Sequence, residues 1–276
     1  MSIQHIAAFS DGSQGGNPAG VLIADTLPPE TEMQEIARQV GFSETAFAAP
    51  QDDGWRVRYF SPETEVPFCG HATIALGAAL ALQHGDAVFP LHLNDADITV
   101  EGRRDGAMLS AALQSPPTKS RPAEEDLVAE ALDLFSIDPG DLDPRLPPAI
   151  AEAGATHLVL ALNSREALAR MAYDLDRGRA FMNAHGLVTV ALVYSETPTL
   201  FHVRNPFASG GVYEDPATGA AAAALAGYLR DRNWPSDGAI DIVQGEDMGA
   251  RSLLEVRYDE TKGGSIRVSG AARVMD

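Results

Sequence analysis

The length and charge of the chain already narrow its class. Its 276 residues suffice for two domains, at roughly 100–200 residues per domain. Its 20 basic and 39 acidic side chains give a formal net charge of −19. This charge argues against nucleic acid or an anionic membrane as a partner, because both are bound through clustered Lys and Arg. A single cysteine, Cys69, excludes an internal disulfide and fits a reducing compartment.

No export signal or membrane span is expected. The first basic residue is Arg38, so the N-terminal stretch lacks the positive region of a signal peptide. The uncharged run 66–85 has a helical part at Ala72–Leu82, which is roughly 16 Å long against a hydrocarbon core of roughly 30 Å. We therefore expect a buried helix there, in a cytoplasmic protein.

The first part of the chain predicts short strands around two helices. The helix after Pro29 has apolar residues at helical spacing and Gly41 as its stop. In chain order, the expected elements are strands 3–9 and 19–24, a helix from about 29 to 40, strands 45–49 and 55–60, the helix 72–82, and a hairpin of strands 98–101 and 107–113.

A Pro- and Ser-rich linker at 114–122 is the clearest domain boundary. Strands and helices alternate irregularly after it, which favours an α+β fold with antiparallel or mixed sheets over a doubly wound parallel sheet. The expected elements are a helix at 123–134, a Pro- and Asp-rich stretch at 138–148, strand 157–162, a helix capped by Ser164, a helix ending near Gly186, strands 187–194 and 200–204, the helix 218–229, and a tail of strands with turns at 245–249 and 263–264.

One structural unit occurs twice, at about 57–73 and 202–220. Each copy runs from a strand through a proline-containing loop to a glycine turn and a helix rich in alanine. Small side chains permit close packing, so we expect both helices to be buried. Ala-rich helices are common, however, and one sequence leaves a chance resemblance between the two copies open.

Missing motifs exclude several chemistries. The chain has no G-x-G-x-x-G or P-loop pattern, no H-E-x-x-H or paired cysteines for a metal, and no G-x-S-x-G elbow. The two lysines, Lys119 and Lys262, fall in the linker and in a terminal turn, where neither suits a Schiff base with pyridoxal phosphate. We therefore expect no cofactor and no metal, and either a cofactor-free enzyme or a binding protein.

Two glycine turns are the first candidate site. Free backbone N–H groups and the helix dipole at Gly70 and Gly219 bind a small anion if the two units face each other across a cleft. Such a cradle would locally overcome the negative charge of the chain.

Three ionisable side chains are candidates for catalysis, each with an alternative. Glu44 lies between a helix stop and an apolar strand, and is alternatively a solvated loop residue or a partner of the Thr45 hydroxyl. His71 lies in an apolar segment, and alternatively makes a backbone hydrogen bond at a helix start. Asp215 precedes Pro216, and is alternatively an N-terminal helix cap.

Four segments carry a family resemblance: Gly16-Asn17-Pro18-Ala19, Phe42-Ser43-Glu44-Thr45-Ala46-Phe47, Pro67-Phe68-Cys69-Gly70-His71-Ala72-Thr73 and Glu214-Asp215-Pro216-Ala217-Thr218-Gly219. In this order and at about this spacing they resemble the PhzF-like family, named for an isomerase of phenazine biosynthesis. The resemblance spans almost the whole chain.

The resemblance implies the diaminopimelate-epimerase-like fold, with two pseudo-symmetric lobes. Each lobe is a mixed or antiparallel sheet wrapped around a central Ala-rich helix, and the active site lies in the cleft between them. We expect residues 1–115 and about 264–276 to form the N-terminal lobe and about 120–262 to form the C-terminal lobe. The resemblance also implies a homodimer and no cofactor.

The resemblance further implies an isomerase that moves a proton between carbons of a small amino-acid-like carboxylate, which is dihydrohydroxyanthranilate in the phenazine enzyme. Glu44 matches the acid–base Glu of the family, and His71 and Asp215 match two other residues of its site. Ala220 stands where the family enzyme has Ser, so one hydroxyl contact is missing. The residues expected to contact the substrate are Ser43, Gly70, Thr218, Gly219 and Ala220.

Two other functions stay open. Cofactor-free racemases of the same fold use two cysteines, and Cys69 resembles the first of them. The chain has no second cysteine, so an epimerase or racemase would have to pair Glu44 with a different, unidentified acid. The other alternative is a non-catalytic protein that kept the fold and binds a small molecule.

Overall fold

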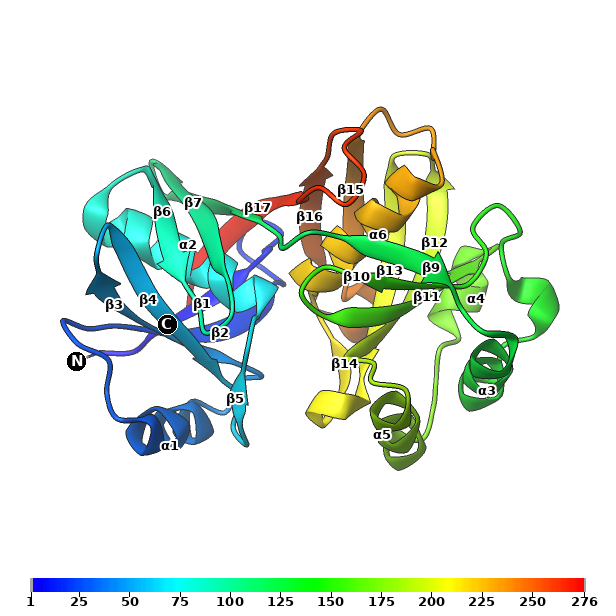
Figure 1. The fold of residues 1–276 in the computed structure, drawn as a ribbon, viewed down its shortest axis with the longest axis horizontal. Coiled ribbons are helices and arrows are strands. Elements are labelled where there is room, and N and C mark those ends of the chain that lie inside the picture. The colour runs from blue at the N-terminus through cyan, green and yellow to red at the C-terminus, as the bar shows by residue number, and fades with distance from the viewer. Residues whose placement is uncertain (1, 276) are drawn as a thin grey trace.

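The chain folds into two lobes that lie side by side (Figure 1). A computed structural model describes residues 2–275. We name residues 4–114 the N-lobe and residues 119–257 the C-lobe. Each lobe curves its strands around one central helix, α2 (Gly70–His84) in the N-lobe and α6 (Gly219–Asp231) in the C-lobe. The α+β architecture expected from the sequence is confirmed.

The N-lobe surrounds α2 with mixed strands. The pairs β2·β3 and β4·β6 are parallel and the other N-lobe pairs are antiparallel. Helix α1 (Glu30–Val40) lies outside, and it ends as predicted at Gly41, whose φ of 71° is the left-handed value that glycine adopts readily. The strands are β1 (Gln4–Ala8), β2 (Asn17–Ile23), β3 (Thr45–Gln51), β4 (Gly54–Phe60), β5 (Glu65–Val66), β6 (Ala87–His92), β7 (Asp97–Asp105) and β8 (Met108–Gln114).

The C-lobe repeats the plan around α6. Its parallel pairs are β11·β12 and β13·β15. The strands are β9 (Lys119–Pro122), β10 (Ala149–Glu152), β11 (Thr156–Leu162), β12 (Thr189–Thr197), β13 (Leu200–Phe207), β14 (Val212–Asp215), β15 (Ala239–Gln244) and β16 (Ser252–Arg257). The outer helices are α3 (Glu125–Phe135), α4 (Arg165–Ala169) and α5 (Leu175–Ala184), and short 3-10 helices span Pro139–Asp141, Ala208–Gly210 and Glu246–Met248.

The last strand, β17 (Arg267–Val274), joins the two lobes. It pairs antiparallel with β1 and β8 of the N-lobe and, at its start, with β16 of the C-lobe. Figure 1 shows this strand in red between the lobes. The lobe boundaries expected from the sequence stay a prediction, and their outermost residues, Met1 and Asp276, lie outside the described residues.

Small residues let the central helices pack inside their lobes. Every residue of α2 from Gly70 to Ala81 is buried. A Cβ added at Gly102 of β7 would lie 2.1 Å from the carbonyl oxygen of Gly77, so strand and helix touch through their backbones. Among residues 2–275, no helix has the length and apolar character needed to cross a membrane.

The element predictions are mostly confirmed, with one correction. Ser164 caps α4, because its side chain accepts a hydrogen bond of 3.1 Å from the N–H of Ala167. The linker predicted at 114–122 is wrong in its second half, because Lys119–Pro122 forms β9 and pairs with β10. Strands β5, β6, β10 and β14 were not predicted.

Candidate active site

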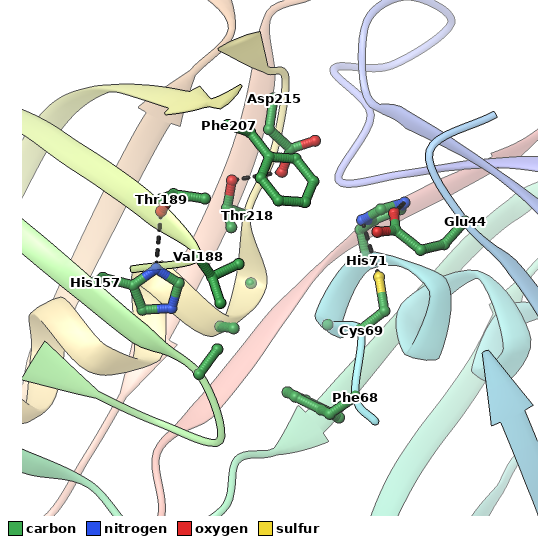
Figure 2. Close-up of a pocket in the computed structure, with 14 residues that line it drawn as sticks. Glu44, Phe68, Cys69, His71, His157, Val188, Thr189, Phe207, Asp215 and Thr218 are labelled. Carbon is green, nitrogen blue, oxygen red and sulfur yellow. Dashed lines mark hydrogen bonds and ion pairs between the residues drawn. The ribbon is translucent and has the colours of Figure 1, made fainter. Parts of the chain in front are cut away.

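A small inner cavity of about 50 Å³ lies where the lobes meet, and it holds the candidate catalytic residues (Figure 2). Glu44 comes from the turn before β3, and His71 from the first turn of α2. Asp215 faces them from the end of β14, with Thr218 just before α6. The pairing of distant segments therefore brings the three ionisable candidates of the sequence analysis to one cavity.

The starts of α2 and α6 touch each other at two glycines. A Cβ added at Gly70 would lie 3.0 Å from the backbone N of Ala220 and 3.1 Å from the Cα of Gly219. The first backbone N–H bonds inside these helices come from Thr73 to Cys69 and from Ala222 to Thr218. The N–H groups before them point out of the helix ends, and no side chain caps either end. The two helix starts therefore face each other, as a two-sided cradle requires, and their binding of an anion stays a prediction.

On the N-lobe side, His71 lies among three polar side chains. Its Nε2 is 3.5 Å from Oε2 of Glu44 and 3.4 Å from Oγ of Ser43, and its Nδ1 is 3.3 Å from Sγ of Cys69. Glu44 is only 6% exposed and His71 only 4%. A thiol that donates to Nδ1 leaves the Nε2–H of His71 directed at the carboxylate of Glu44.

On the C-lobe side, Asp215 is held by a chain of hydrogen bonds. Asn17 Nδ2 donates to Asp215 Oδ1 at 2.7 Å and to the carbonyl of Ala217 at 2.9 Å. Thr218 Oγ1 donates to Asp215 Oδ2 at 2.5 Å and itself accepts from Gln244 Nε2 at 3.0 Å. These contacts fix the carboxyl group of Asp215 from both lobes, because Asn17 belongs to the N-lobe.

Burial sets the protonation of two groups in this cavity. Burial raises the pKa of Asp215 to about 6, with the Glu44 carboxylate acting in the same direction and His71 against it. Burial and the Glu44 carboxylate hold the pKa of the Cys69 thiol well above its usual value. Asp215 therefore exchanges protons near neutral pH, whereas Cys69 stays a thiol.

The ligand atoms of Glu44, Cys69 and His71 lie within 4.8 Å of one another, close enough to share a divalent cation. A cysteine binds metal as the thiolate. Because the cavity holds the thiol protonated, this cluster binds a cation only at the cost of removing that proton. The expectation of a metal-independent site stays a prediction.

A larger outer cavity of about 540 Å³ continues from the inner one. The two share Glu44, Phe68, Ala155, Val188 and Phe207. Pockets for small ligands usually measure about 300–1,000 Å³. A substrate therefore has room for its reacting end in the inner cavity and for the rest of the molecule in the outer one.

The structure decides several alternatives left open by the sequence. Glu44 is not solvated, and Thr45 Oγ1 has no hydrogen-bond partner among residues 2–275, so neither alternative for Glu44 is right. The alternative of Asp215 as a helix cap is wrong, because no side chain caps α6. His71 makes its contacts with side chains.

The expected substrate-contacting residues lie around both cavities. Gly70, Thr218, Gly219 and Ala220 line the inner cavity, whereas Ser43 lines the outer one and reaches the site through His71. Sequence reasoning missed several polar neighbours: Asn17, His157, Thr189 and Gln244. Asn17 lies in a turn motif before a strand, and this motif could have identified it. The other three lie in segments with ordinary strand patterns, which do not mark a site residue.

Comparisons with known proteins show the family of the chain. Residues 6–276 match the family described as phenazine biosynthesis-like protein, PhzC-PhzF. The chain is 31% identical to the uncharacterized isomerase YddE of Escherichia coli O157:H7, over 99% of this chain and 96% of that one. It is 32% identical to the trans-2,3-dihydro-3-hydroxyanthranilate isomerase of Pseudomonas aeruginosa, over 96% of this chain and 91% of that one.

Solved structures share the fold. A protein from Pseudomonas aeruginosa titled a predicted epimerase superposes with a TM-score of 0.86 at 25% identity, covering 99% of this chain and 96% of that one. A probable proline racemase from Agrobacterium radiobacter gives a TM-score of 0.67 at 10% identity, covering 99% and 90%, a likeness in fold alone. The relatives named isomerases bear out the expectation of an enzyme of that class. The chain belongs to the phenazine biosynthesis-like (PhzC-PhzF) family.

Proposed function

We propose that this isomerase moves a proton from one carbon to another of a small, amino-acid-like carboxylate, with Glu44 as the acid and base. The observation that carries the proposal is a carboxylate that is 6% exposed and lies in a cavity beside two uncapped helix starts. A carboxylate in such a place is screened from water, so an abstracted proton stays in the site until it is returned.

The substrate carboxylate binds at the two helix starts. The free N–H groups around Gly70 and Gly219 supply hydrogen bonds and the positive ends of two helix dipoles. Because the two starts touch each other, one carboxylate group can contact both. This anchoring fixes the carbon chain relative to Glu44, and fixed geometry is a large part of the rate enhancement of such an enzyme.

His71 and Asp215 orient the substrate and balance charge as the proton moves. His71 lies 3.5 Å from the carboxylate of Glu44 and can donate to it or to an oxygen of the substrate. Asp215 faces the same cavity and, with a pKa of about 6, can hold the amino or hydroxyl group of the substrate in either protonation state.

A second function, epimerisation, is favoured by one observation. An epimerase needs an acid on each face of the reacting carbon, and Asp215 lies on the lobe opposite Glu44 with a raised pKa. It is the candidate for the second acid that the sequence left unidentified. Inversion of a chiral substrate, without movement of a double bond, would favour this function over isomerisation.

The first substrate to test is trans-2,3-dihydro-3-hydroxyanthranilate, for which the Pseudomonas aeruginosa relative is named. It carries the carboxylate, amino and hydroxyl groups that this site suits. Ala220 offers no hydroxyl to it, so related cyclic amino acids belong in the same assay. The homodimer, which the family resemblance implies, and the cytoplasmic location, which the lack of a recognisable export signal implies, remain predictions, and analytical ultracentrifugation tests the first of them.

The Glu44→Gln substitution tests the proposed role of Glu44. It keeps the shape of the side chain and removes the group that accepts the proton, so kcat should fall by roughly 10²–10⁴-fold. The matched control is Glu166→Gln on the exposed face of α4, which should keep full activity. Thermal unfolding verifies that both variants are folded. Unchanged turnover by Glu44→Gln would refute the proposal.

A further inference from the structure

His157 on β11 has an unsatisfied ring nitrogen in the inner cavity. The side chain is fully buried and lines the cavity with Glu44, His71 and Asp215. Figure 2 shows it on the C-lobe side, across the cavity from Cys69 and His71. Its Nε2 has no hydrogen-bond partner among residues 2–275. The proposed function gives this side chain no role.

The neighbours of His157 determine which ring nitrogen carries the proton. Nδ1 lies 2.8 Å from Oγ1 of Thr189, and this Oγ1 donates its only proton to Oδ1 of Asn205 at 2.8 Å. Thr189 can therefore only accept from the ring, so Nδ1 carries the hydrogen and donates. Nε2 is then an unprotonated acceptor. Burial lowers the pKa of His157 to about 4, so the ring is neutral near pH 7.

A buried acceptor without a partner costs free energy, and the cavity is the place from which a partner can come. The opposite wall already provides a base, and the helix starts provide donors for a carboxylate. An acceptor at Nε2 adds an uncharged acceptor on the C-lobe side, besides the carboxyl group of Asp215, and it suits a hydrogen-bond donor on an uncharged or weakly basic part of a ligand.

We propose that His157 determines substrate specificity by accepting, at Nε2, a hydrogen bond from an O–H or N–H group of the substrate. This inference rests on the proposed function, which places the substrate in the inner cavity. It narrows the substrate to a small carboxylic acid that carries a hydroxyl or amino group on the side facing the C-lobe. Thr189 and Asn205 act as positioning residues that keep the lone pair of Nε2 directed at the substrate.

Two substitutions of His157 distinguish the contributions of its two ring nitrogens. In His157→Asn the amide lies near the place of Nδ1, which keeps the contact with Thr189 and removes the acceptor from the cavity. In His157→Gln the amide reaches the place of Nε2 and returns an acceptor there. A merely structural role predicts the opposite ranking, because it requires the Thr189 contact that only His157→Asn keeps.

Binding is measured by calorimetry in the Glu44→Gln background, so that turnover is not needed. The probes are benzoate, anthranilate and 3-hydroxybenzoate, which carry a carboxylate alone, with an amino group, and with a hydroxyl group. We expect His157→Asn to weaken binding of one of the two donor-bearing acids by roughly 10- to 100-fold, with benzoate unchanged. His157→Gln should recover part of the loss. Which acid responds identifies the donor as amine or hydroxyl.

Nitrogen NMR of the labelled histidine ring gives a second readout. We expect a pyridine-type Nε2 in the free protein, and a shift toward the hydrogen-bonded value only with the acid that responds in the binding assay. A pyrrole-type Nε2, or equal weakening of all three probes by His157→Asn, would overturn the inference. Undiminished turnover by Glu44→Gln would instead refute the role of Glu44 and leave the selectivity of His157 standing.

Discussion

Asp215 is the side chain whose negative charge most clearly destabilises the folded protein. It is 4% exposed, and its pKa is raised to about 6, mainly by burial. Asn17 and Thr218 donate hydrogen bonds to its two oxygens but do not outweigh the loss of water. The protein therefore keeps an unfavourable charge in its cavity at neutral pH, which is typical of a functional carboxyl group.

This raised pKa predicts how stability depends on pH. The folded protein binds the proton of Asp215 more tightly than the unfolded chain, so the stabilisation is fully present below about pH 4 and is lost as the pH rises through about 6. The loss is on the order of 3 kcal/mol. Asp215→Asn, which has no such charge, should gain stability relative to the wild type by this order between pH 4 and pH 7.5.

Chemical denaturation at the two pH values measures this difference, and the comparison between variants cancels the titration of other groups. Parallel stability curves for the wild type and Asp215→Asn would contradict the raised pKa. Asp215→Asn should also lower kcat, because the cavity loses its second ionisable carboxyl group.

The residues around Asp215 show which parts of the site can be predicted from the sequence and which cannot. Glu44, His71 and Asp215 were found because each lies near a recognisable turn or helix start and within a motif of the family resemblance. Gln244 and His157 lie inside strands, where a polar residue looks like any other. Their roles arise from pairings such as β11 with β12, which bring His157 beside Thr189 across 32 positions of sequence. Such contacts between distant segments cannot be recognised from local sequence patterns.

At the scale of elements, the two glycine-led helix starts are the parts that the site needs most. Gly70 and Gly219 let α2 and α6 meet through their backbones, so their free N–H groups share one small space. A side chain on Gly70 would push the halves of the cradle apart, whereas a Cβ on Gly219 would lie 3.4 Å from the Cα of Gly70, which is an ordinary contact distance. The absence of a Cβ at Gly70 is thus a requirement of the site as well as of the packing.

Gly70→Ala tests this requirement. The added Cβ would lie 3.0 Å from backbone N of Ala220, so the helix starts must move apart by a few tenths of an ångström. We expect kcat/KM to fall by roughly 10-fold or more, with a stability loss of about 1–3 kcal/mol. The control is Gly140→Ala, whose Cβ would meet only a flexible carboxylate at 3.1 Å. Full kcat/KM in Gly70→Ala would refute the shared cradle.

Elements with a clear local sequence pattern were predicted, and most elements without one were missed. The helices were predicted well, because alanine content, caps and spacing are properties of the sequence itself. Strand β6 was missed because Pro90 lies within it and lowers its strand signal. Strands β5, β10 and β14 are too short to show a pattern. β9 looked like a linker, since only its pairing with β10 makes it a strand.

For the whole molecule, contacts between the lobes hold the two sides of the site together. Asn17 of β2 holds Asp215, and the N–H of Leu253 donates to the carbonyl of Phe9 at 2.9 Å. β17 pairs with strands of both lobes. The repeat seen in the sequence thus becomes two similar halves tied at their junction, with the proposed acid–base group between them. Burial of this group at the junction favours direct return of a proton over its exchange with water.

The most direct test follows one hydrogen through the reaction. A substrate with deuterium at the carbon that loses its proton is converted in ordinary water, and mass spectrometry and NMR locate the label in the product. We predict deuterium at the new carbon for the wild type and no measurable conversion by Glu44→Gln over the same time. A product that keeps all its deuterium at the original carbon, formed equally fast by Glu44→Gln, would contradict proton transfer by Glu44.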